Sequence, residues 1–214
     1  MAWKATPIWN SLPVLILLAA CSAVVPAQIV PATGPAHAPT ARSDDPRVAS
    51  ALRFARAYNQ GRVGDALQQT ADLDAMFQAM FGADWDDSSP DARAEMTHLY
   101  IRLMNLAFER SADAPPAPQP TSEDVVIHKS EPDSAVVRVT VYQDQRPMRL
   151  YLDMVRRGRL WKITDLHEAG EPSWVNEIQR RWVIVKGNTT PQAFIRELYV
   201  GVARASRPPA TQPE

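Results

Sequence analysis

The sequence has few of the residues from which covalent or metal-held scaffolds are built. Cys21 is the only cysteine among 214 residues, so no disulfide can form within the chain. Histidine is also scarce, and none of His37, His98, His128 and His167 has a second histidine or a cysteine at the spacing of a zinc site. We therefore expect neither a resident metal ion nor a cofactor.

A surplus of charge of either sign is also missing. The chain carries 23 basic and 24 acidic side chains, which gives a formal net charge of -1. Nucleic-acid-binding domains usually carry an excess of lysine and arginine. We therefore expect no nucleic acid partner.

The apolar stretch near the amino terminus, from Leu12 to Ala20, is too short to cross a bilayer. Because it follows the positive charge of Lys4 and ends in small residues, it has the form of a secretion signal. The four residues that end in Cys21, Leu-Ala-Ala-Cys, resemble the bacterial lipobox. That resemblance implies cleavage before Cys21 and its acylation, with palmitate among the acyl groups. An ordinary signal peptide, cut near Ala23 or Ala27, is the alternative.

Together these features predict a bacterial cell-envelope protein that is held at a membrane by Cys21 and faces the periplasm. Ser22, rather than an aspartate, follows the cysteine. By the sorting rule for lipoproteins this favours the outer membrane.

Proline-rich segments divide the chain. Residues 1–20 are the expected signal peptide, and residues 21–45 are the lipidated cysteine with a Pro/Ala-rich tether. A single domain is expected over 46–205, interrupted by a proline-rich insert at 111–123 and followed by a disordered tail at 206–214.

The first half of this domain has the hydrophobic period of helices. The spacing predicts one helix through Val48, Leu52, Ala55 and Tyr58, and a second that carries five apolar residues. A third and longer helix carries Met96, Leu99, Tyr100, Leu103 and Ala107 on one stripe. The five residues of the second helix are Leu73, Met76, Phe77, Met80 and Phe81.

After the insert the hydrophobic period changes to two, which predicts four antiparallel strands. Met148, Leu150, Leu152 and Met154 alternate with polar residues, and Gly158 marks a tight turn. In the last strand we expect Trp161 and Ile163 to share a face with Asp165 and His167. Two helices follow, the first ending at Gly187 as a left-handed cap, the second beginning after Thr190. The fold class is α+β: a helical half, a four-stranded antiparallel sheet and two terminal helices.

The acidic stretch GADWDDSSPDARAE (82–95) resembles a calcium loop in the spacing of Asp84, Asp86, Ser88 and Glu95. The glycine that such a loop needs at its sixth position is replaced by Ser89, however. A junction between two helices explains the stretch better, because Gly82 can end one helix while Ser89 and Pro90 begin the next.

An enzymatic alternative would gather Tyr151, Asp153, Asp165 and His167 in a pocket of the sheet, where they could transfer protons. Tyr151 and Asp153 alternate with the apolar residues of their strand, which predicts exposure to solvent instead. We therefore expect no catalytic residues.

The segment DLDAMFQAMFGADWDDSSPDARAEMTHLYIRLM (72–104) resembles the MlaC-type, or toluene-tolerance, family of periplasmic phospholipid carriers. The second half agrees at Trp161, Lys162, Asp165, Gly170, Ser173, Val175 and Asn176. The expected anchor at Cys21 and the proline-rich insert depart from the family pattern. The resemblance implies an MlaC-like fold with a cone-shaped sheet, like that of nuclear-transport-factor-like proteins.

The resemblance also implies a protein that binds phospholipid or a similar hydrophobic ligand and acts in lipid transport between membranes, with partners in transport complexes of the inner or outer membrane. Two alternatives remain: a nuclear-transport-factor-like domain that binds or converts a small molecule, and a non-catalytic accessory envelope lipoprotein. For the ligand we select apolar side chains of two strands and the long helix: Leu99, Leu103, Met148, Leu150, Leu152, Met154, Trp161 and Ile163.

Overall fold

The computed structural model describes residues 44–110, 115–143 and 145–206. The expected signal peptide, Cys21 and nearly all of the tether lie outside the described residues. The described elements belong to one compact unit, which spans Ala36–Glu214. Within the described ranges no helix is long and apolar enough to cross a membrane.

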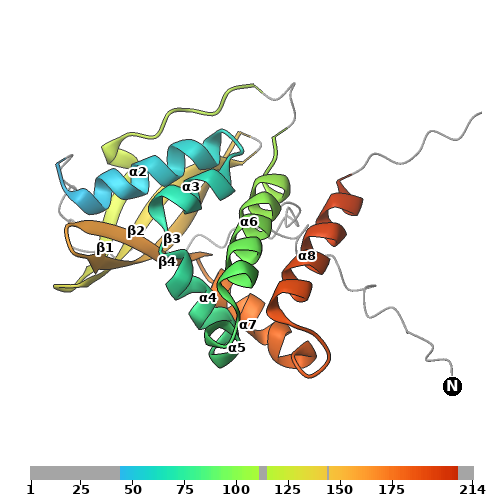
Figure 1. Cartoon of the computed structure of the whole chain (residues 1–214). Coiled ribbons are helices and arrows are strands. Elements are labelled where there is room, and N and C mark those ends of the chain that lie inside the picture. Colours follow the sequence, from blue (N-terminus) through green and yellow to red (C-terminus); the bar gives the residue numbers. More distant parts are fainter. Residues whose placement is uncertain (1–43, 111–114, 144, 207–214) are drawn as a thin grey trace, which may run out of the picture. The chain divides into compact units, whose positions relative to one another are not determined.

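Helices come first along the chain, then a sheet, then two more helices (Figure 1). The expected α+β class, with a helical half ahead of the sheet and two helices after it, is confirmed. The elements are α2 (Pro46–Asn59), α3 (Val63–Thr70), α4 (Leu73–Phe81), α5 (Ala83–Asp86), α6 (Pro90–Ala107), the 3₁₀ turn η2 (Ser122–Asp124), β1 (Val125–Ser130), β2 (Ser134–Gln143), β3 (Arg146–Arg157), β4 (Leu160–Glu168), α7 (Trp174–Val185) and α8 (Pro191–Ala205).

The sheet has the order β1-β2-β3-β4 with every neighbouring pair antiparallel. One face of each strand is buried, as the alternation predicted: Val137, Val139 and Val141 of β2 lie opposite Leu152, Leu150 and Met148 of β3. Helix α2 packs along this face and contacts β1, β2 and β4. The free edge of β4 is partly covered, because Asp72 N donates to Ile163 O at 2.8 Å.

The face assignment expected for β4 is wrong. Met154 is paired with Ile163 but Asp153 with Asp165, so β4 has one extra residue at Thr164. Such a bulge moves every later side chain to the other face. Trp161 and Ile163 therefore lie on the side that α2 covers, whereas Asp165 and His167 lie on the opposite side.

Helix α3 was not predicted from the sequence. It has no side-chain cap of its own at Arg62. The cap comes from α6 instead: Asn105 Oδ1 accepts from Gly64 N at 2.8 Å, and Asn105 Nδ2 donates to Asp65 Oδ1 at 2.8 Å. The two helices approach so closely that a Cβ on Gly64 would lie 2.0 Å from Ile101 O.

The cap predicted for α7 is also wrong in its conformation. Gly187 does not adopt a positive φ. The chain instead leaves α7 through Lys186 in a right-handed conformation, with Lys186 N bonded to Trp182 O and Asn188 N to Val185 O, both at 2.8 Å. The start of α8 is as expected, because the Thr190 hydroxyl accepts from Ala193 N.

Candidate functional site

The apolar interior consists of two neighbouring regions. The first, the sheet–α2 layer, lies between the inner face of the sheet and α2. It is formed by aliphatic and aromatic side chains that are at most 4 % exposed. They are Val48, Ala51, Phe54, Ala55, Tyr58, Val137, Val139, Val141, Leu150, Leu152, Met154 and Ile163.

Most of the residues selected from the sequence as ligand-lining lie in or beside this layer. Leu150, Leu152, Met154 and Ile163 are buried within it. Met148 and Trp161 are half-buried on the same face, at opposite ends of the sheet. The selected strand residues therefore form one continuous apolar surface.

The two selected residues of the long helix lie elsewhere. Leu103 is buried and Leu99 is half-buried on α6, which packs mainly against α8 and α3. The helix that covers the sheet is α2. Its buried residues Phe54 and Tyr58 therefore lie beside the selected strand residues, although neither was among the residues predicted to line the ligand. Hydrophobic spacing identified α2 as amphipathic, but spacing does not say which helix faces the sheet.

The second region, the aromatic cluster, joins α4, α5, α6, α7 and α8. Phe77 contacts Trp85 and Tyr100, with ring centroids 4.8 Å and 5.2 Å apart. Phe81 meets Trp182 edge to face at 5.3 Å. Burial raises the pKa of the Tyr100 hydroxyl, which accepts a 2.7 Å hydrogen bond from Trp174 Nε1. Large rings packed against one another in tilted and edge-to-face pairs fill space with little freedom to rearrange.

Methionine is prominent in the interior. Five methionines are at most 1 % exposed: Met76, Met80, Met96, Met104 and Met154. An unbranched side chain with three rotatable bonds can change shape at low cost, unlike the rings of the aromatic cluster. The α4, α6 and β3 surfaces that carry these methionines are therefore the part of the core best able to adapt to a bound molecule.

The acidic stretch 82–95 forms a helix junction, as predicted. Gly82 ends α4 at φ 59°, and the Ser89 hydroxyl caps α6 by accepting from Ala92 N. The carboxylates serve the fold: Asp84 accepts from Trp182 Nε1 at 3.1 Å and Asp86 from Gln78 Nε2 at 2.9 Å. Within the described part of the chain, no group of three or more His, Cys, Asp or Glu side chains could hold a metal ion.

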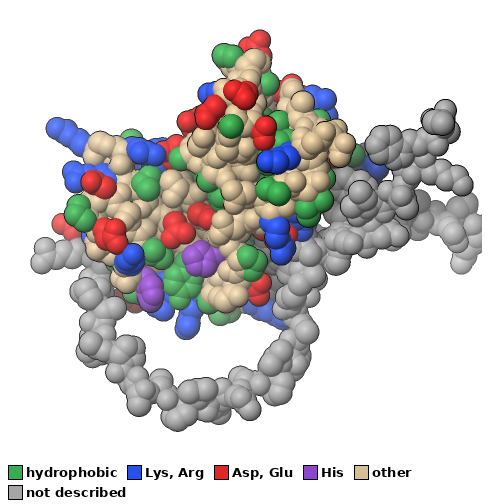
Figure 2. All heavy atoms as spheres, turned by 90° about the horizontal axis from the view of Figure 1, so that it is seen from below, with side chains coloured by type: hydrophobic (Ala, Val, Ile, Leu, Met, Phe, Trp, Pro, Cys, Tyr) green, Lys and Arg blue, Asp and Glu red, His purple; other side chains and the backbone are tan. Residues whose placement is uncertain are grey.

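The four residues of the enzymatic alternative lie on the outer face of the sheet. Tyr151 stands between two imidazoles, with its ring centroid 5.6 Å from that of His128 and 5.3 Å from that of His167. His167 Nδ1 is 4.0 Å from Asp153 Oδ2, too far for a hydrogen bond. Figure 2 shows histidine, hydrophobic and charged side chains side by side on this surface. Burial raises the pKa of Asp153, an effect that His167 opposes and Asp165 reinforces.

Asp165 is a structural link between β4 and α7. Its Oδ1 accepts from Leu166 N at 2.7 Å and from Val175 N, in the first turn of α7, at 3.1 Å. A carboxylate at this position satisfies a free amide and favours the positive end of the helix. These hydrogen bonds give Asp165 a structural role, which does not depend on any catalytic function.

Comparison with known proteins agrees with this architecture. A family described as MlaC protein matches residues 49–178, more than half of the chain. A solved structure of a phospholipid-binding protein from Ralstonia solanacearum, in complex with a phospholipid, has a similar fold, with a TM-score of 0.50 and 16% identity over 76% of this chain and 94% of that one. No curated protein sequence matches. On the family match, the chain belongs to the MlaC family.

Proposed function

We propose that this protein binds a phospholipid, with its acyl chains in the sheet–α2 layer of the apolar interior, and carries it between membranes of the bacterial envelope. The observation that carries the proposal is the continuous apolar face of Leu150, Leu152, Met154 and Ile163, close to a core rich in buried methionine. Family membership supports it, as does the phospholipid bound by the structural neighbour.

The chemistry required is simple. Each CH₂ of an acyl chain favours transfer out of water by about 0.8 kcal/mol, so two long chains provide ample driving force for entering an apolar interior. The polar headgroup gains nothing there and stays at the surface. Binding and release need no bond to be made or broken, so the proposed role is that of a carrier and not an enzyme.

The proposal includes the anchor at Cys21. Acyl groups on this residue would keep the domain at one membrane, facing the periplasm and, given Ser22, at the outer membrane. Labelling of cells with radioactive palmitate tests this part. Label should appear in the wild-type protein and be absent from Cys21→Ala; equal labelling of both, or of neither, would contradict the anchor.

Transfer of lipid is tested with the compact unit Ala36–Glu214 and two vesicle populations. Donor vesicles carry a self-quenched fluorescent phospholipid, and acceptors carry none. The protein should raise the transfer rate in proportion to its concentration, and Leu152→Trp, which fills the sheet–α2 layer, should lower that rate. Phe81→Trp, a large substitution in the aromatic cluster, is the control and should transfer lipid like the wild type. No acceleration by the wild-type protein would exclude a carrier.

A further inference from the structure

We infer that the turn between β3 and β4 is a docking surface for an anionic phospholipid bilayer. The segment from Val155 to Lys162, VRRGRLWK, contains Arg156, Arg157, Arg159 and Lys162 and no acidic residue. This surface is distinct from the apolar interior, and its role does not depend on which ligand the interior holds.

The turn projects past its neighbouring strand. In the register of the sheet, β2 begins at Ser134, opposite Val155, so residues 156–160 extend beyond it. Gly158 allows the tight reversal with a φ of 61°. Figure 2 shows basic side chains projecting at the left end of the molecule, the end where Figure 1 places this turn.

An exposed apolar side chain lies among these charges. Leu160 is 61% exposed, one of the few large hydrophobic side chains on the surface of the described residues. A leucine beside arginines suits the boundary between headgroups and acyl chains, because the apolar side chain leaves water there while the guanidinium groups stay among the charged headgroups.

Most of the positive charge remains available to a partner. Arg157 pairs with Asp72 at 2.7 Å yet keeps a side chain that is 57% exposed. The side chain of Arg156 donates to the carbonyl of Gly158 and its main-chain N to Asp133 O at 2.9 Å, and Arg159 pairs with no carboxylate of the described residues. The adjoining turn between β1 and β2 holds two acidic residues: Glu131, which pairs with Lys129, and the exposed Asp133, whose main-chain O accepts from Arg156 N. Against these two stand the four basic residues of the β3–β4 turn.

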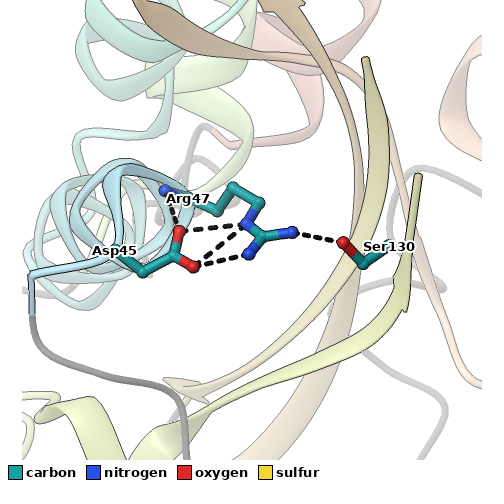
Figure 3. A network of polar contacts seen from close by, with 3 residues as sticks. All are labelled: Asp45, Arg47 and Ser130. Carbon is teal, nitrogen blue, oxygen red and sulfur yellow. Dashed lines mark hydrogen bonds and ion pairs between the residues drawn. The ribbon is translucent and has the colours of Figure 1, made fainter. Parts of the chain in front are cut away.

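The base of the turn is held firmly. Arg47, in the first turn of α2, donates to Ser130 Oγ at 2.5 Å and is fixed by Asp45, whose Oδ2 accepts at 2.6 Å (Figure 3). The same guanidinium lies 5.5 Å from the centroid of Trp161. The side chain of Arg47 thus connects both edge strands, β1 and β4, to the start of α2. A membrane anchor upstream of Asp45 would therefore connect to the domain at the end that carries the basic turn.

Co-sedimentation with vesicles tests the proposal. The unit Ala36–Glu214, which lacks Cys21, is mixed with vesicles of phosphatidylglycerol and phosphatidylethanolamine, or of phosphatidylcholine alone. We expect binding to the anionic vesicles only, and less of it at high salt. Arg156→Ser/Arg159→Ser should lower the partition coefficient about 30-fold, and Leu160→Ser about tenfold.

Matched control variants distinguish binding through the β3–β4 turn from a general effect of lost positive charge or lost surface hydrophobicity. Arg56→Ser/Arg204→Ser removes the same charge from exposed sites outside the turn, and Ile184→Ser removes a 73% exposed side chain from α7. Both controls should bind as the wild type does, and thermal unfolding should show that all variants fold. Arg159→Ser alone leaves the turn's own hydrogen bonds intact and should still weaken binding. Equal binding by wild type and turn variants, equal losses in the controls, or no binding to anionic vesicles would overturn the proposal and favour a protein partner.

Discussion

Gly64 is the residue with the least room for change. A Cβ there would meet the Ile101 carbonyl of α6 at 2.0 Å, a contact with backbone that no rotamer change relieves. We expect Gly64→Ala to lower the free energy of unfolding by about 3 kcal/mol, measured by urea denaturation. Gly187→Ala is the matched control, because its Cβ would meet nothing within 4 Å. Equal stability of the two variants would show that α3 and α6 are not packed this closely.

The raised pKa of Asp153 predicts the direction in which the stability of the fold changes with pH. Because burial raises the pKa of the Asp153 carboxyl above its ordinary value of 3.8, the folded state binds this proton more readily than the unfolded chain does. Ionised Asp153 therefore destabilises the fold at neutral pH, and the penalty disappears as pH falls through the raised pKa toward 3.8. Asp153→Asn should raise the Tm at pH 7 but not at pH 3. The control variant Asp133→Asn, at an exposed position, should leave the Tm unchanged at both pH values. An unchanged or lower Tm at pH 7 would contradict this.

The faces of β4 show where prediction from single residues fails. Alternation correctly assigns the buried residues of β2 and β3, because their pairing is regular over the whole length. Nothing in the sequence marks the extra residue at Thr164, whose hydroxyl donates to Asp153 O at 3.2 Å. The bulge is fixed by cross-strand contacts, so the opposite faces of Ile163 and Asp165 become evident only in the folded sheet.

At the scale of elements, Asp165 joins the sheet to the helices that follow it. Replacing it with alanine removes the acceptor of Val175 N, and we expect a loss of about 1–2 kcal/mol in the free energy of unfolding. Asp165→Asn keeps an acceptor oxygen and should cost less. Chemical denaturation of both variants measures the difference. Full stability of Asp165→Ala would contradict the structural role and return attention to the enzymatic alternative.

Elements with local signals could be predicted, and elements that depend on distant residues could not. Helix α6 has Ser89 and Pro90 at its start and a long apolar stripe, all visible in the sequence. Helix α3 has only eight residues, and its cap is Asn105, forty-one positions after Gly64. No pattern within residues 63–70 contains that information.

For the molecule as a whole, the fold class and the family could be predicted because they depend on the order of elements and on motifs spread along the chain. The proposed ligand-lining surface could be predicted only as apolar strand faces. Which helix covers them is decided by packing: α2 lies on the sheet, and α6, with Leu99 and Leu103, lies against α3 and α8. Phe54 and Tyr58 of α2, which are buried against this face, therefore belong with the proposed lining residues.

Native mass spectrometry tests phospholipid binding most directly, on the unit Ala36–Glu214 exported to the periplasm behind a cleavable signal peptide and purified from there without detergent. If the apolar interior holds phospholipid, the spectrum should contain the protein with one bound lipid, whose fragments identify a headgroup and two acyl chains. Leu152→Trp should reduce the bound fraction while Phe81→Trp preserves it. A wild-type protein that is repeatedly free of lipid, and remains so after incubation with phospholipid vesicles, would contradict phospholipid binding.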